Sequence, residues 1–182
     1  MAPIFRVLLV PGSLRRESTN AAVLRSALAC APATVQGAVY HGMEALPAFN
    51  PDADRDPLPP AVEELRGQIR GADALVFSTP EYAGDLPGSF KNLLDWTVGD
   101  AQPGSISTKP VAWINVSTRG AAHAHDALRR VLGYVGADII EPACVELPLT
   151  SDVVGEDGLI ADRAVRQELT RVLETLAAAR RP

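Results

Sequence analysis

Hydroxyl and guanidinium side chains are concentrated in residues 11–20, directly after a mostly apolar run at residues 5–10. These side chains can donate hydrogen bonds to phosphate oxygens, and a helical pattern that starts at Ala21 would add N–H groups and a positive dipole end. The polar residues of this loop are Ser13, Arg15, Ser18, Thr19 and Asn20. Gly12 is expected to let the backbone approach a ligand closely. The loop has neither a Walker Lys-Ser/Thr pair nor a three-glycine dinucleotide turn, so it predicts binding of a terminal monophosphate.

Two further loops follow runs of strand length. Residues 74–77 are uninterruptedly apolar, as expected of a parallel strand covered on both faces, and residues 110–117 form another strand pattern. Ligands of open α/β sheets bind at the carboxyl ends of such strands, so the three loops are expected to meet at one edge. The residues at the two additional ends are Pro80, Glu81, Tyr82 and Ala83, and Ser117, Thr118, Arg119 and Gly120.

The elements that would position these loops alternate between strand and helix. The strand patterns lie at residues 5–10, 34–40, 74–79, 110–117 and 138–147. Helical stripes are clearest late in the chain, where apolar residues recur at i, i+4, i+7, i+8 and i+11 from Ala124 and again from Val165. The alternation predicts one α/β domain over residues 1–182, with a doubly wound, five-stranded parallel sheet of order 2-1-3-4-5 and helices on both faces.

Two separated motifs make a specific resemblance. Residues 12–20 read Gly-Ser-Leu-Arg-x-x-Ser-x-Asn, and residues 80–96 read Pro-Glu-Tyr-x-x-x-x-Pro-Gly-x-x-Lys-Asn-x-x-Asp-Trp. Together they resemble the NAD(P)H-dependent FMN reductase family of flavodoxin-like proteins, and the likeness runs along nearly the whole chain. The chain departs from the family at Ala83, where many relatives have Asn, and at Glu17, an acid inside the anion-binding loop. Glu17 is expected to face solvent or to pair with an arginine.

The resemblance implies FMN as the cofactor, NADPH or NADH as the electron donor, and quinones, flavins or similar small molecules as acceptors. It assigns the FMN phosphate to residues 11–20, the ring and ribityl chain to residues 80–83, and the polar edge of the ring to residues 117–120. No side chain is expected to be catalytic, because flavin N5 carries the chemistry. The family also implies a homodimer or homotetramer. The chain holds no second nucleotide fingerprint, so donor and acceptor are expected to take turns in a ping-pong mechanism.

The composition excludes several other classes of function. With 47% hydrophobic residues and a net charge of −5, the chain is expected to be a soluble globular protein without affinity for nucleic acid or membranes. The first strand pattern leaves no room for a signal sequence, which predicts a cytoplasmic location. Cys30 and Cys144 lie far apart, and His123 and His125 would diverge on a helix, so no metal site is expected. The two histidines are expected to be solvated or to lie at a helix start.

Other interpretations stay open on the sequence alone. An FMN-binding electron carrier or redox-sensing interaction protein would need a charged docking patch, and none is evident around the loops. A nucleotide-binding scaffold without redox chemistry would be colourless when purified. Residues 41–60 contain five prolines and are expected to form a long surface loop, which would be a connector, a lid or a contact with a partner subunit. Glu81 is expected to fix its loop or contact a partner subunit rather than act as an acid or base.

Overall fold

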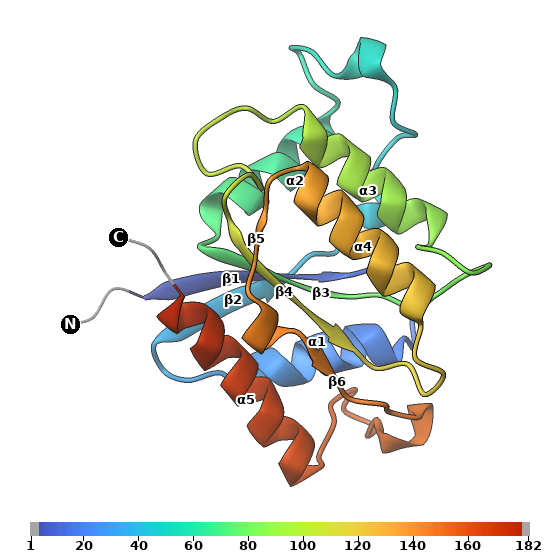
Figure 1. Cartoon of the computed structure of the whole chain (residues 1–182), viewed down its shortest axis with the longest axis vertical. Helices are drawn as coiled ribbons and strands as arrows, with labels where there is room; N and C mark the ends of the chain where they lie inside the picture. The colour runs from blue at the N-terminus through green and yellow to red at the C-terminus, as the bar shows by residue number, and fades with distance from the viewer. Residues whose placement is uncertain (1–3, 180–182) are drawn as a thin grey trace.

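The computed structural model describes residues 4–179, in which a parallel sheet lies between two layers of helices (Figure 1). The strands are β1 (Phe5–Pro11), β2 (Val35–Val39), β3 (Ala74–Ser78), β4 (Pro110–Asn115), β5 (Asp138–Ile139) and β6 (Val145–Glu146). The helices are α1 (Thr19–Ala29), α2 (Pro60–Gly71), α3 (Gly88–Val98), α4 (Ala122–Tyr134) and α5 (Arg163–Ala178). The strand order β2-β1-β3-β4-β5 confirms the predicted fold class and topology.

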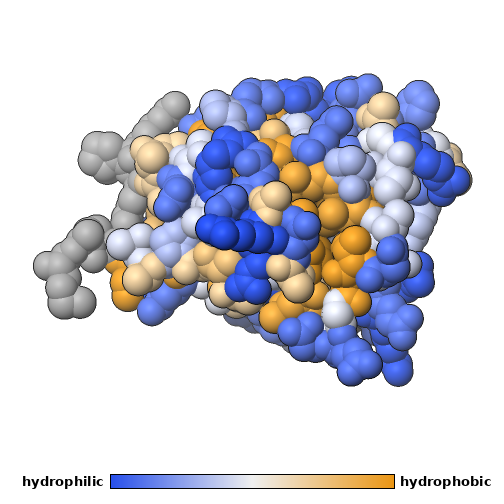
Figure 2. Space-filling model, turned by 90° about the horizontal axis from the view of Figure 1, so that it is seen from below, coloured by the Kyte–Doolittle hydropathy of each residue, from blue (hydrophilic) through white to orange (hydrophobic). Residues whose placement is uncertain are grey.

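The two faces of the sheet carry separate hydrophobic cores, because side chains alternate along each strand. In β1, Val7 and Leu9 pack on the face covered by α1 and α5, whereas Leu8 and Val10 pack on the face covered by α2, α3 and α4. Figure 2 views the molecule from below, where α1 and α5 lie, and shows apolar surface framed by hydrophilic residues. The stripes predicted for the last two helices contribute buried Ala124, Leu128, Leu132, Leu169, Val172, Leu173 and Leu176.

The prediction of a single fifth strand over residues 138–147 is wrong. This segment forms β5 and β6, which are separated by a 3-10 turn at Glu141–Ala143. Pro142 lies inside that turn, and a proline cannot continue a strand ladder because it lacks an N–H group and its ring fixes φ. Both short strands still pair in parallel with β4, so the edge of the sheet keeps its predicted place.

The proline-rich segment at residues 41–60 is a largely irregular connection that contains two 3-10 turns, Met43–Ala45 and Pro51–Ala53. It is attached to α3 of its own chain. The side chain of Asn92 accepts a hydrogen bond from the backbone of Phe49 at 2.7 Å, and the indole N–H of Trp96 donates to a backbone carbonyl of the segment at 2.8 Å. The rings of Phe49 and Trp96 also meet edge to face, with 4.9 Å between their centroids.

Candidate functional site

The three predicted loops leave the sheet at the same edge. Pro11 at the end of β1 pairs in register with Ser78 at the end of β3, and Phe77 pairs with Trp113 of β4. Since all three strands are parallel, the segments that follow them emerge side by side, on the right of Figure 1. The fold therefore places the three loops that the sequence predicted for the site at one edge of the sheet.

The first loop presents hydroxyl groups at the start of α1. Ser18 is the N-cap of this helix, and its Oγ accepts a hydrogen bond from Ala21 N at 3.4 Å. A capping hydroxyl that accepts this bond still has its own hydrogen to donate. Ser13 Oγ accepts from the backbone N–H of Arg15 at 3.2 Å, while the Arg15 side chain is exposed. The loop thus keeps a free guanidinium beside a capped helix N-terminus.

Asn20 faces the protein interior instead of the loop surface. It is buried, and the hydroxyl of Ser78 lies 2.9 Å from its Oδ1 and 2.7 Å from the carbonyl of Ile114. This contact joins α1 to the ends of β3 and β4. Asn20 therefore supports the loop from behind.

Gly12 packs closely against other residues of this chain. A Cβ atom at this position would lie 2.4 Å from Thr79 Oγ1 and 3.0 Å from the Phe90 ring. The absence of a side chain therefore lets the first loop pack against the loop that follows β3. Tight packing between two loops is therefore a reason for glycine at this position, in addition to the expected approach of the backbone to a ligand.

The second loop contains a tight turn at residues 82–85. The backbones of Tyr82 and Asp85 exchange two hydrogen bonds, of 3.0 and 3.1 Å, and the central residues Ala83 and Gly84 have φ values of 51° and 75°. Positive φ at both central positions defines a type I′ turn, which suits Asn and Gly better than Ala. Tyr82 projects from this turn with 51% of its surface exposed, and its hydroxyl lies 3.4 Å from Ser13 Oγ.

Glu81 precedes this turn and contacts a helix that begins far along the chain. Its Oε2 accepts a hydrogen bond from the backbone N–H of Ala124, in the first turn of α4, at 3.2 Å. The contact fixes the second loop, which is one of the roles expected for Glu81 from the sequence.

The third loop is held by a residue that the sequence analysis did not assign to the site. The side chain of Asn115 donates to the carbonyl of Gly120 at 2.6 Å and accepts from the N–H of Ser117 at 3.0 Å. Thr118, Arg119 and Gly120 are exposed at the tip. A polar residue at the end of an apolar strand is the signal that could have identified Asn115.

Both histidines lie at the start of α4, which is one of the two positions expected for them, but they differ in burial. His123 is exposed, but His125 is buried in the first turns of α4, with its ring 6.2 Å from that of Trp113. Its Nδ1 lies 2.9 Å from the carbonyl oxygen of Ala121, and a carbonyl can only accept, so Nδ1 carries the proton. Within residues 4–179, no group of three or more His, Cys, Asp or Glu side chains could hold a metal ion.

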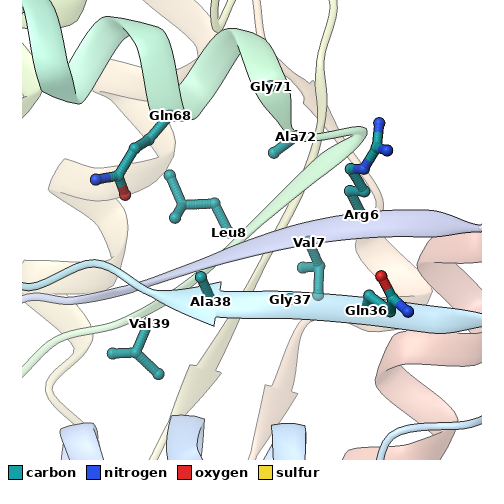
Figure 3. A pocket seen from close by; sticks show the side chains of 10 residues that line it. All are labelled: Arg6, Val7, Leu8, Gln36, Gly37, Ala38, Val39, Gln68, Gly71 and Ala72. Atoms are coloured by element: carbon teal, nitrogen blue, oxygen red, sulfur yellow. The ribbon is translucent and has the colours of Figure 1, made fainter.

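Cavities adjoin the loops on two sides. One of about 480 Å³ is bordered by Arg15, Ser18 and the segment at residues 151–158, and another of about 340 Å³ by Asn115, Gly120 and His125. The hollow in Figure 3, of about 490 Å³, lies away from them, beside β2 and the end of α2. It contains none of the predicted site residues. Residues 151–158 were not predicted to border the site, because they come close to the first loop only in the folded chain.

The donor groups at this edge suit an elongated ligand with a phosphate at one end and an aromatic ring at the other. Hydroxyls, a guanidinium and a helix N-terminus favour the phosphate. An exposed tyrosine and the polar backbone of residues 117–120 favour a flat, heteroatom-rich ring. The residues present therefore fit a flavin mononucleotide.

Comparisons with known proteins agree with this chemistry. The model of the NADPH-dependent FMN reductase family matches residues 5–150. The chain is 32% identical over 180 residues to the NAD(P)H-dependent FMN reductase PA1204 of Pseudomonas aeruginosa. This alignment covers 97% of this chain and 95% of that protein. It is 30% identical over 175 residues to a quinone reductase of Escherichia coli K12, with 93% and 92% covered.

Among solved structures, FerB of Paracoccus denitrificans, a flavoenzyme NAD(P)H:(acceptor) oxidoreductase, matches with a TM-score of 0.76 and 25% identity. The match covers 96% of this chain and 98% of that one. The chain therefore belongs to the NADPH-dependent FMN reductase family and is an FMN-dependent oxidoreductase that uses NAD(P)H.

Proposed function

We propose that the three loops hold FMN and that the enzyme reduces quinones, flavins or similar small molecules with electrons from NAD(P)H. FMN, when bound, supplies the ring that accepts and returns hydride. The observation that carries this proposal is the convergence of phosphate donors and an exposed aromatic ring at one sheet edge of a chain in this family. The protein's part is to bind and orient the reactants, and no side-chain acid or base is assigned.

The first loop is proposed to bind the phosphate. Arg15 has an exposed guanidinium that can make a bidentate contact, and Ser13 and Ser18 have hydroxyl hydrogens to donate. Thr19 begins α1 and adds the N–H groups of its first turn. Asn20 acts indirectly, through its contact with Ser78. Glu17 is exposed, which agrees with the expectation that it faces solvent.

The second and third loops are proposed to hold the ring. Tyr82 offers an aromatic surface on the turn that continues from Pro80 to Ala83, and Glu81 fixes that turn against α4. Within residues 117–120, Thr118 and Arg119 offer a backbone N–H group, a hydroxyl and a guanidinium to the polar edge of the ring. The N–H groups of Ser117, Arg119 and Gly120 donate to acceptors at the third loop itself. Hydrogen-bond donors at this edge stabilise the negative charge that the ring gains on reduction.

The assembly and location are also proposals. We expect one domain over residues 1–182 that assembles as a homodimer or homotetramer, because Tyr82 and the third loop leave the ring end of the site open in one chain. Light scattering at micromolar concentration tests the oligomeric state, and a fully active monomer contradicts the expected assembly.

No helix within residues 4–179 is long and apolar enough to cross a membrane. We expect the enzyme in the cytoplasm, where NAD(P)H is available, and cell fractionation tests this.

The decisive experiment follows the flavin spectrum. Purified protein should be yellow and should release FMN on denaturation. NADH or NADPH should bleach the band at about 450 nm without oxygen, and a quinone should restore it. If donor and acceptor take turns at one face, double-reciprocal plots at several quinone concentrations should be parallel. A bound flavin that stays oxidised with both donors would favour an electron carrier, and intersecting plots would require a ternary complex.

A further inference from the structure

Helix α4 begins without a cap of its own. Its N-cap residue is Ala121, which has a left-handed backbone with a φ of 49° and no side chain that could accept a hydrogen bond. The first N–H groups of a helix need acceptors from elsewhere. For α4, the carboxylate of Glu81 supplies one by accepting from Ala124 N at 3.2 Å. The acceptor lies 43 residues before the donor in the chain.

The same contact connects two of the ligand loops. Ala121 directly follows Gly120, the last residue of the third loop, whereas Glu81 directly precedes Tyr82 in the second. The Tyr82 hydroxyl then reaches Ser13 of the first loop at 3.4 Å. In the second loop, Tyr82 therefore contacts the first loop, and Glu81 contacts the helix that directly follows the third loop.

The charge and the local backbone favour this role for Glu81. A carboxylate at a helix N-terminus also interacts well with the positive end of the helix dipole. The carbonyl of Ala121 is held by the buried ring of His125 at 2.9 Å, so the start of α4 is fixed from inside as well. The contacts of Glu81 and His125 together fix the start of α4, and with it the position of the third loop relative to Tyr82.

We propose that Glu81 is a positioning residue for the flavin reaction, because its carboxylate caps α4 and so preforms the ring end of the site. This inference rests on the proposed binding of FMN. It assigns Glu81 no proton transfer. It requires that loss of the carboxylate weaken binding of the ring, while contacts with the phosphate stay intact.

The test compares two helix caps. Glu81→Ala removes the cap of α4, and Asp162→Ala removes the cap of α5, where Asp162 Oδ1 accepts from Val165 N at 2.9 Å, outside the three loops. Each variant loses one carboxylate and one capping hydrogen bond, so Tm should fall by similar amounts. Quenching of flavin fluorescence gives the Kd of FMN and of riboflavin, which has the same ring but no phosphate.

Glu81→Ala should raise the Kd of both flavins by a similar factor, about tenfold, which is the loss expected when one capping contact no longer preforms the site. Asp162→Ala should leave both values within about twofold of the parent, although it is equally destabilised. Glu81→Gln, which keeps an acceptor of the same length, should restore most of the binding. Glu81→Asp, which is one methylene shorter, should bind both flavins more weakly than the parent. If Glu81→Ala does not fold, Glu81→Asp is measured in its place.

Three results would overturn the inference. Glu81→Ala or Glu81→Asp could bind both flavins like the parent, Asp162→Ala could weaken them as much as Glu81→Ala, or FMN could lose far more affinity than riboflavin, which would place the effect at the phosphate. A parent protein that binds neither flavin would contradict the proposed function instead. The two failures are therefore distinguishable.

Discussion

Arg15→Ala should weaken FMN binding without affecting the fold. The Arg15 side chain is exposed, and the hydrogen bond of this residue to Ser13 comes from its backbone N–H, which alanine keeps. The free energy of unfolding should therefore change by no more than about 0.5 kcal/mol. A hydrogen bond between a guanidinium and a phosphate contributes about 1.5 to 3 kcal/mol. Its loss should raise the Kd of FMN by about one to two decades.

Riboflavin and a neighbouring arginine provide the controls. Riboflavin lacks the phosphate, so Arg15→Ala should leave its Kd nearly unchanged. Arg16→Ala removes the same charge from the next exposed position and should weaken FMN by less than about threefold, because screened charges contribute little at a distance. Titrations of flavin fluorescence with the parent and both variants give the six Kd values, one for each protein with each flavin. Equal losses for FMN and riboflavin, or equal losses in both variants, would refute the assignment of Arg15 to the phosphate.

Three further predictions concern stability. Ala83→Gly should stabilise the protein by about 0.5 to 1 kcal/mol in urea unfolding, because relief of the left-handed backbone exceeds the entropy cost of glycine; a loss would contradict the turn geometry. Gly12→Ala should cost about 1 to 3 kcal/mol through its clash with Thr79, and a further Thr79→Ala should recover part of this in the same assay. Burial raises the pKa of the Cys144 thiol from 9.0 to about 11, so its stabilising effect is complete below pH 9 and is lost towards pH 11. The stability of the parent relative to Cys144→Ala should therefore fall over this range, and a constant difference would refute the shift.

Local patterns in the sequence were sufficient to predict the architecture and to place the three polar loops at one edge of the sheet. The run at residues 5–10, which is apolar except for Arg6, and the wholly apolar run at residues 74–77 identified two central strands, because a strand covered on both faces is apolar along most of its length. The parallel topology then placed the polar segments that follow these strands at one edge. The break between β5 and β6 was also readable in principle, since Pro142 cannot take part in a ladder.

Only the tertiary structure decided which side chains contact one another across that edge. Glu81 caps a helix that starts 41 residues later, Gly12 leaves space for Thr79, and His125 is buried near Trp113. No periodicity or motif encodes these pairs. Each depends on the distance and direction between backbone segments that are remote in the sequence, and these are set when the helices pack on the sheet. Composition and spacing identify the groups that can make hydrogen bonds, whereas the folded chain selects the partner of each.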